Sequence, residues 1–219
     1  MGNARLWYHG GIAGVLGICC YIMAIFIPWP DTQWGLSVSV IVVSGFPILG
    51  IVASYAVCDY IAAPRATAAN RIALGFAIAG FATLLAMLLV QVAVNSALPE
   101  ITRDLDATAA KALTRAMRMV DLGLDVAWDL LYSTAMILWG FALRTRRGFG
   151  PGWAFPSMAL GALLIVLNVA TFPWPPGDHG SVDLGPVAAL FILALNIRLA
   201  YLGWRALRSG SRRDTTAES

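Results

Sequence analysis

The sequence predicts an all-α, polytopic membrane protein: a six-helix transmembrane bundle with an amphipathic helix before the fourth span. Of the 219 residues, 59% are hydrophobic and only 12% are charged, whereas a typical soluble domain carries about 25% charged residues. The mean hydropathy is +0.74. The apolar residues also form runs of about 20, the length at which a helix crosses roughly 30 Å of hydrocarbon.

Six such runs predict six spans. Four of them contain no Asp, Glu, Lys or Arg, the fourth contains Asp125 and Asp129, and the sixth contains Asp183 and Arg198. Helices are expected because lipid cannot satisfy backbone polar groups and because the runs lack the alternation of a barrel strand. The first run is too long for the apolar core of a secretory signal, so we expect a retained helix. The spans lie at about residues 8–27, 36–57, 72–94, 122–143, 153–172 and 181–203.

The chain is expected to form one transmembrane domain, residues 1–208, with a short tail. No linker or second domain interrupts this stretch. The tail, residues 209–219 (SGSRRDTTAES), is polar and lacks large apolar residues. Such a segment cannot bury enough apolar surface to offset its ordering, so we expect a disordered cytoplasmic tail.

The third loop has the pattern of an amphipathic helix. Asp106 is a suitable N-cap for it, and we expect this helix to run into the fourth span without a break. Its apolar residues recur at helical spacing: Ile101, Leu105, Ala109, Ala112, Leu113, Ala116 and Val120.

The basic residues predict the orientation, because Lys and Arg gather on the cytoplasmic side of membrane proteins. With six spans, the two termini and the second and fourth loops share one side, and that side contains all but four of the 15 basic residues. The exceptions lie in the third loop: Arg103, Lys111, Arg115 and Arg118. We therefore expect a multi-pass protein of the cell inner (plasma) membrane with both termini in the cytoplasm.

Several functional classes are disfavoured by the sequence. No basic stripe interleaved with exposed aromatic residues is present, which argues against nucleic-acid binding. The three cysteines, Cys19, Cys20 and Cys58, form no CxxC motif and lie in or beside spans, so they are expected to be buried apolar residues. No cofactor motif is evident. The expected partner is the lipid bilayer, and the sequence does not define an oligomeric state.

One polar stripe on the fourth span is the candidate functional feature. Asp121, Asp125 and Asp129 are spaced by four residues, so they lie in one narrow sector of a helix. Arg118 and Tyr132 fall on the same face. Asp129 lies roughly 10 Å into the span. Because an aspartate at mid-membrane costs about 2.5–3.5 kcal/mol, Asp129 must face the bundle interior or a cavity, be neutral, or have a partner.

Three interpretations of the stripe stay open. In the first, the protein is structural or accessory, and Arg118, Gln91 and Asn168 partner the carboxylates. In the second, an outward-facing acidic cavity binds or transports a cation, a proton or a small solute. In the third, the protein is a membrane-embedded hydrolase with Asp125, Asp129 and His179 on a metal ion, although metal enzymes usually add more histidines than this chain supplies. We expect a non-enzyme.

Two stretches of sequence carry a family resemblance. From Tyr55 to Val94, a span ends in an aromatic and Pro-Arg stretch (DYIAAPRATAANRIAL) before the next span begins. From Asp129 to Val169, a Gly-rich span leads through LRTRRGFGPGW into another. This layout resembles the DUF4386-like group of uncharacterised bacterial multi-pass membrane proteins. The resemblance implies a bacterial inner-membrane protein of six or seven helices, and it implies no activity and no catalytic residues.

Overall fold

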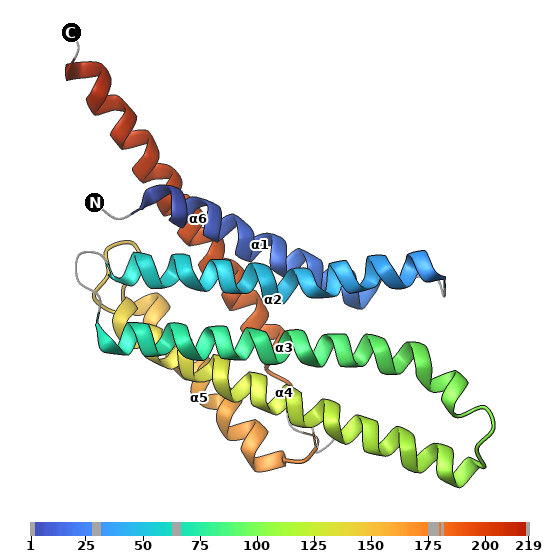
Figure 1. The fold of residues 1–219 in the computed structure, drawn as a ribbon. Coiled ribbons are helices and arrows are strands. Elements are labelled where there is room, and N and C mark those ends of the chain that lie inside the picture. Colours follow the sequence, from blue (N-terminus) through green and yellow to red (C-terminus); the bar gives the residue numbers. More distant parts are fainter. Residues whose placement is uncertain (1–2, 28–31, 63–66, 175–179, 181, 218–219) are drawn as a thin grey trace.

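A computed structural model describes residues 3–27, 32–62, 67–174, 180 and 182–217, with the backbone alone after residue 209. These residues form six α-helices, and all six are long and apolar enough to cross a membrane. The prediction of an all-α, six-helix membrane bundle is therefore confirmed. In chain order (Figure 1) the helices are α1 (Ala4–Phe26), α2 (Gln33–Ala62), α3 (Ala68–Ile101), α4 (Ala107–Leu143), α5 (Pro151–Thr171) and α6 (Gly185–Ala217).

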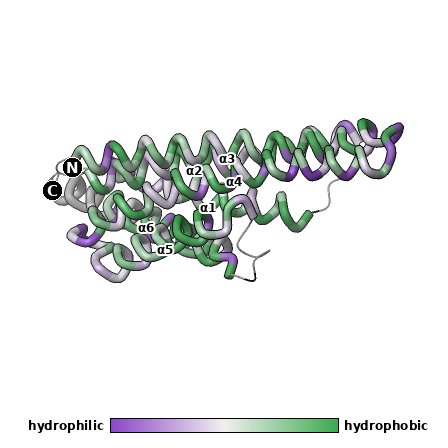
Figure 2. Tube along the Cα trace, turned by 90° about the horizontal axis from the view of Figure 1, so that it is seen from below, coloured by the Kyte–Doolittle hydropathy of each residue, from purple (hydrophilic) through white to green (hydrophobic). Residues whose placement is uncertain are grey.

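The α3–α4 hairpin is the longest part of the bundle. The two helices contain 34 and 37 residues, which at 1.5 Å per residue makes each more than about 50 Å long. The hairpin extends past the ends of the other helices, and its tip is hydrophilic (Figure 2). The predicted amphipathic helix is continuous with the fourth span, and the Asp106 carboxylate caps it by accepting the backbone N–H groups of Thr108 and Ala109 at 2.8 and 3.0 Å.

Helix α6 differs from its predicted bounds at both ends. It begins at Gly185 rather than near residue 181, and the Asp183 carboxylate accepts the N–H of Gly185 at 2.8 Å. It then continues to Ala217, through most of the tail for which the composition predicts disorder. Extending an existing helix adds one hydrogen bond per residue without a new nucleus, which favours this continuation even in a polar segment.

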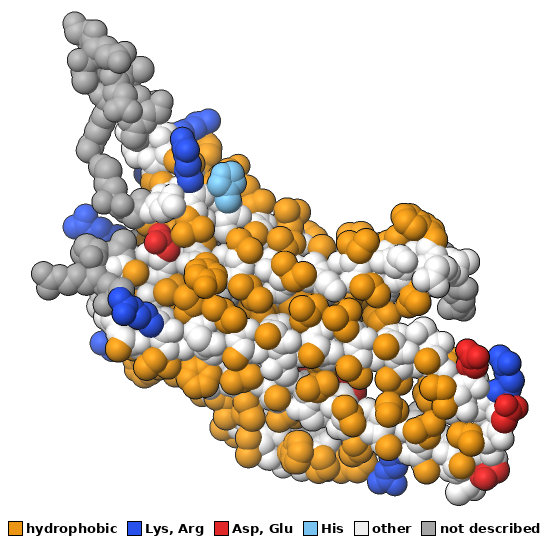
Figure 3. All heavy atoms as spheres, in the orientation of Figure 1, with side chains coloured by type: hydrophobic (Ala, Val, Ile, Leu, Met, Phe, Trp, Pro, Cys, Tyr) orange, Lys and Arg blue, Asp and Glu red, His pale blue; other side chains and the backbone are white. Residues whose placement is uncertain are grey.

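The six helices place the chain's two ends at one end of the bundle. Both termini lie there in Figure 1, together with the C-terminal end of α2, the N-terminal end of α3 and the α4–α5 connection. We call it the arginine-rich end, because Arg5, Arg144, Arg147, Arg205 and Arg208 belong to it. The opposite end is the hairpin end. On the face drawn in Figure 3, charged side chains gather at these two ends and the surface between them is largely apolar.

From α1 to α5, each helix packs against the next one in the chain. Helix α6 packs mainly against α1 and makes few contacts with α5. The contact between α1 and α6 depends on small residues. A Cβ atom added to Gly11 would lie 2.5 Å from the backbone nitrogen of Ala200 and 2.7 Å from the carbonyl oxygen of Asn196. Gly10 and Gly14 face α2 and α6 respectively. The small residues of α1 therefore allow a close approach to two different neighbouring helices.

Hydrogen bonds between elements close the arginine-rich end. The Trp7 indole N–H donates to the Asp59 carboxylate at 2.8 Å, which joins α1 to α2. The Tyr60 hydroxyl donates to the carbonyl of Arg147. The Arg198 guanidinium donates to the carbonyl of Gly148 at 2.9 Å, which joins α6 to the α4–α5 connection. These contacts fix one end of the bundle, and the cavity described below lies towards the other.

A matched pair of Gly→Ala variants tests the α1–α6 packing. Gly11→Ala is expected to destabilise the protein by about 1–3 kcal/mol, because the methyl group forces two backbones apart. Gly75→Ala adds the same group to α3 where no atom lies within 4 Å, and it is expected to stabilise by about 0.5–1 kcal/mol. Thermal unfolding of the purified variants in detergent measures both. Equal midpoints for the two variants would contradict the packing described.

Candidate functional site

The three aspartates of α4 lie on the side of the helix that faces the interior of the bundle. Asp121, Asp125 and Asp129 are all half-buried, and all three line one large cavity. The opposite side of α4 carries exposed apolar residues such as Val120 and Phe141. The sequence predicts that Asp129 must avoid lipid, and the structure meets this condition because α4 turns its aspartate face towards the interior of the bundle.

The cavity has a volume of about 1440 Å³ and extends to the hairpin end. Residues of α1, α2, α3, α4 and α6 line it, with Leu164 from α5. At the hairpin end its walls include the exposed residues Thr32, Asn95 and Asp183. Among the described lining residues there are four aspartates and no lysine, arginine or histidine. The cavity is therefore acidic.

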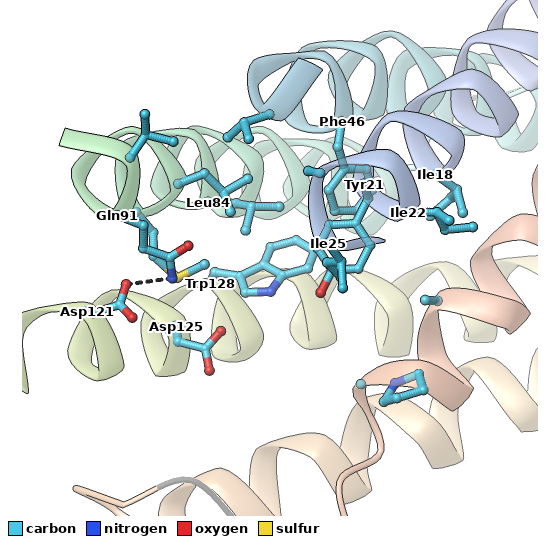
Figure 4. Close-up of a pocket in the computed structure, with 18 of the residues that line it drawn as sticks. Ile18, Tyr21, Ile22, Ile25, Phe46, Leu84, Gln91, Asp121, Asp125 and Trp128 are labelled. Atoms are coloured by element: carbon cyan, nitrogen blue, oxygen red, sulfur yellow. Dashed lines mark hydrogen bonds between the residues drawn. The ribbon is translucent and has the colours of Figure 1, made fainter. Parts of the chain in front are cut away.

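Two of the three α4 carboxylates are hydrogen-bonded to neighbouring helices. The Gln91 amide donates to Asp121 Oδ1 at 2.7 Å, which links α3 to α4 (Figure 4). The Asn168 amide donates to Asp129 Oδ2 at 2.8 Å and to the carbonyl of Leu164 at 3.0 Å, which links α5 to α4. These are the amide contacts that the structural interpretation expects of Gln91 and Asn168.

Asp125 differs from its two neighbours. Within the described part of the chain its carboxylate has no hydrogen-bond partner. Figure 4 shows it beside Asp121 on α4, on the same side as the Trp128 indole. Because Asp125 lines the cavity and is only half-buried, its carboxylate is open to whatever occupies the cavity.

The remaining predicted site residues are placed differently. Tyr132 lines the cavity and is only 8% exposed, with its ring 4.9 Å from that of Trp128. Arg118 is exposed on the outer part of α4 and is not among the described residues that line the cavity. Further out on the same helix, Arg115 lies 5.8 Å from the ring centre of Trp174.

Three aromatic side chains of the cavity were not predicted as site residues. Tyr21 of α1, Phe46 of α2 and Trp128 of α4 all line it. Phe46 joins them, with its ring centre 5.0 Å from Tyr21 and 6.4 Å from Trp128. The only sequence signal is the position of Trp128, since the other tryptophans lie near the predicted span ends. The three aromatic residues come together only because α1, α2 and α4 pack around the same cavity, which the sequence does not predict.

A second, small cavity of about 30 Å³ lies beside the first. It shares four walls with the large cavity, namely Phe46, Tyr132, Met136 and Ile192. Its own lining includes Ser54, Ser157 and Asn196. The helix faces that carry Asp129 and Asn196 therefore line neighbouring cavities, which are separated by side chains that include Phe46 and Tyr132. The sequence alone does not predict that these two faces lie close together.

The described residues contain no group of three or more His, Cys, Asp or Glu side chains that could hold a metal ion. His179, the histidine of the hydrolase interpretation, lies outside the described residues. That interpretation stays a prediction.

The site combines an acidic cavity with one carboxylate that the protein leaves available. Such a site can accept a positively charged group without first breaking a protein contact. Comparisons with protein-family models, with curated proteins and with solved structures give no match for this chain. The resemblance to the DUF4386-like group stays a prediction.

A double-mutant cycle tests whether Asn168 holds Asp129. The cycle Asp129→Ala with Asn168→Ala is expected to give a coupling of about 0.6–2 kcal/mol, the range for hydrogen bonds between membrane helices. The control cycle, Gln91→Ala with Asn168→Ala, combines residues whose hydrogen bonds go to different aspartates and should be additive within about 0.5 kcal/mol. Unfolding in mixed micelles measures both, and equal coupling in the two cycles would contradict the assigned contact.

Proposed function

We propose that the acidic cavity binds a positively charged solute, with Asp125 as the carboxylate that contacts it. The single observation behind this proposal is that Asp125 lines the cavity and has no partner within the described part of the chain. Asp121 and Asp129 place two more carboxyl groups nearby, and the amide side chains that hydrogen-bond to them carry no positive charge. Carboxylates in a low-dielectric wall attract a cation far more strongly than carboxylates in water.

We further propose that the cavity opens outward, with the arginine-rich end in the cytoplasm of a bacterial cell. The distribution of arginine supports this orientation. Acidic residues at the mouth, such as Asp183, would then raise the local concentration of cations from the external solution.

The structural interpretation is the contrasting account, and the two amide contacts favour it. Gln91 and Asn168 would serve to fix α3 and α5 against α4. That account gives Asp125 no role, although its half-buried position carries a cost. A carboxylate at this position is more readily explained by a ligand than by packing.

Movement of the cation across the bilayer is a second candidate function. It is favoured by the small cavity whose lining includes Asn196, which is separated from the acidic cavity only by shared side chains such as Tyr132 and Phe46. Transport would require these side chains to move apart. Uptake of the solute into vesicles that contain the purified protein would distinguish transport from binding alone.

A thermal-shift experiment tests the proposed binding. Potassium, magnesium and tetramethylammonium chlorides are compared at constant ionic strength, and at least one is expected to raise the unfolding midpoint of the wild type. A cation at 100 times its dissociation constant adds about 2.7 kcal/mol. Asp125→Asn should abolish this response and raise the midpoint measured without added cation, because it removes a like charge from beside Asp121.

The control variant is Asp59→Asn, which changes a carboxylate outside the cavity that accepts from Trp7. It should lower the midpoint and leave the cation response intact. A wild-type protein whose midpoint ignores every cation would rule out the proposal, and so would a full response in Asp125→Asn.

A further inference from the structure

The cavity is large enough to hold a ligand bigger than an inorganic ion. Its volume of about 1440 Å³ exceeds the roughly 300–1,000 Å³ of most small-molecule pockets. A dehydrated Mg²⁺ or Ca²⁺ ion needs about six or more oxygen ligands around it. The described residues offer no group of three acidic or histidine side chains arranged in that way.

Two walls of the cavity differ in character, one being acidic and the other apolar. The acidic side is the face of α4 that carries Asp121, Asp125 and Asp129. The apolar side comes from α1 and α6 (Figure 4 labels its α1 residues): Ile18, Ile22, Ile25, Leu190 and Leu193. A solute that contacts both sides must combine a positive charge with an apolar body.

Aromatic rings stand between the two sides. Figure 4 shows the Trp128 indole between the α4 carboxylates and the rings of Tyr21 and Phe46. These rings come from three different helices, and all three line the cavity. The faces of aromatic rings attract cations, and Trp, Tyr and Phe together form the usual binding site for alkylated ammonium groups.

The deep wall of the cavity contains a polar group that the protein does not use. Ser133 lines the cavity and is only 1% exposed, and its hydroxyl oxygen has no hydrogen-bond partner within the described part of the chain. Buried hydroxyls nearly always have a partner in native proteins. This hydroxyl is therefore a second polar feature of the wall below Asp129, independent of the carboxylates, which a bound ligand would satisfy after a change of the side-chain rotamer.

We infer that the ligand is an organic ammonium ion with an apolar body, bound with its charge between Asp125 and Trp128 and its body against α1 and α6. This inference rests on the proposed cation binding and assigns a chemical class to the solute. Trp128 is then a specificity-determining residue, since it contacts the charge without supplying a carboxylate.

Calorimetric titration of the full-length protein with tetramethyl-, tetraethyl- and tetrabutylammonium chlorides tests the inference, with potassium chloride as the reference cation. Affinity should rise at least tenfold from tetramethyl- to tetrabutylammonium, because each added methylene finds an apolar wall. Asp125→Asn should abolish the binding of all three. Trp128→Leu should weaken it about fivefold or more through loss of the ring, and Trp128→Phe should restore part of the loss.

The matched control is Trp34→Leu, the same substitution at a tryptophan that is 74% exposed and outside the described cavity lining. It should bind all three ions as the wild type does. If Trp128→Leu fails to fold, Trp128→Phe still tests the inference. An affinity of Trp128→Phe equal to that of the wild type would overturn the inference. A wild-type affinity that does not depend on alkyl length would also overturn it.

Two failures can be told apart. If potassium binds through Asp125 and the alkylammonium ions bind no more tightly, the proposed function stands and the assigned class is wrong. If no cation binds in a manner that depends on Asp125, the proposed function itself fails. Tetrabutylammonium that binds equally to wild type and Asp125→Asn would reflect partition into detergent, and it would also overturn the inference.

Discussion

Three carboxylates spaced four residues apart fix the rotation of α4, and the rest of the bundle is arranged around that constraint. An aspartate facing lipid would cost about 2.5–3.5 kcal/mol at mid-membrane, so the face with Asp125 and Asp129 must turn inward. That rotation brings Gln91 and Asn168 into hydrogen-bonding distance from the two neighbouring helices. It also turns the aromatic rings of Trp128 and Tyr132 towards the interior, where both line the large cavity and Tyr132 forms part of the wall between the two cavities.

The two ends of the bundle differ in how tightly they are held. Hydrogen bonds from Trp7, Tyr60 and Arg198 tie helices and a connection together at the arginine-rich end. The large cavity occupies the half towards the hairpin end, where α3 and α4 extend beyond the other helices. A bundle closed at one end and hollow at the other is suited to receive a solute from one side, and this asymmetry links the fold to the proposed binding.

Much of this could be predicted from sequence because it depends on local patterns. The six helices follow from apolar runs, the Asp106 cap from residue type, and the inward ribbon from the spacing of its aspartates. Even the partners Gln91 and Asn168 could be named, since few other polar side chains exist at that depth. The aromatic cluster could not, because Tyr21, Phe46 and Trp128 meet only through the packing of three helices. Arg118 shares the helical face but lies outside the described cavity lining, so helical phase alone does not define which residues line the cavity.

The most direct test of the account is whether water and cations reach the interior of the bundle from outside the cell. Ser39 lines the cavity, while Ile41 on the same helix is 70% exposed on the outer surface of the bundle, where lipid is expected. Each is changed to cysteine in a variant without Cys19, Cys20 and Cys58, and intact cells are treated with impermeant cationic or anionic thiosulfonates, which the ionised thiol attacks to form a mixed disulfide with release of sulfinate. The account predicts that Ser39→Cys is labelled and Ile41→Cys is not, with the cationic reagent favoured roughly tenfold over its ratio for free cysteine. An unreactive Ser39→Cys, or one labelled faster by the anionic reagent, would contradict it.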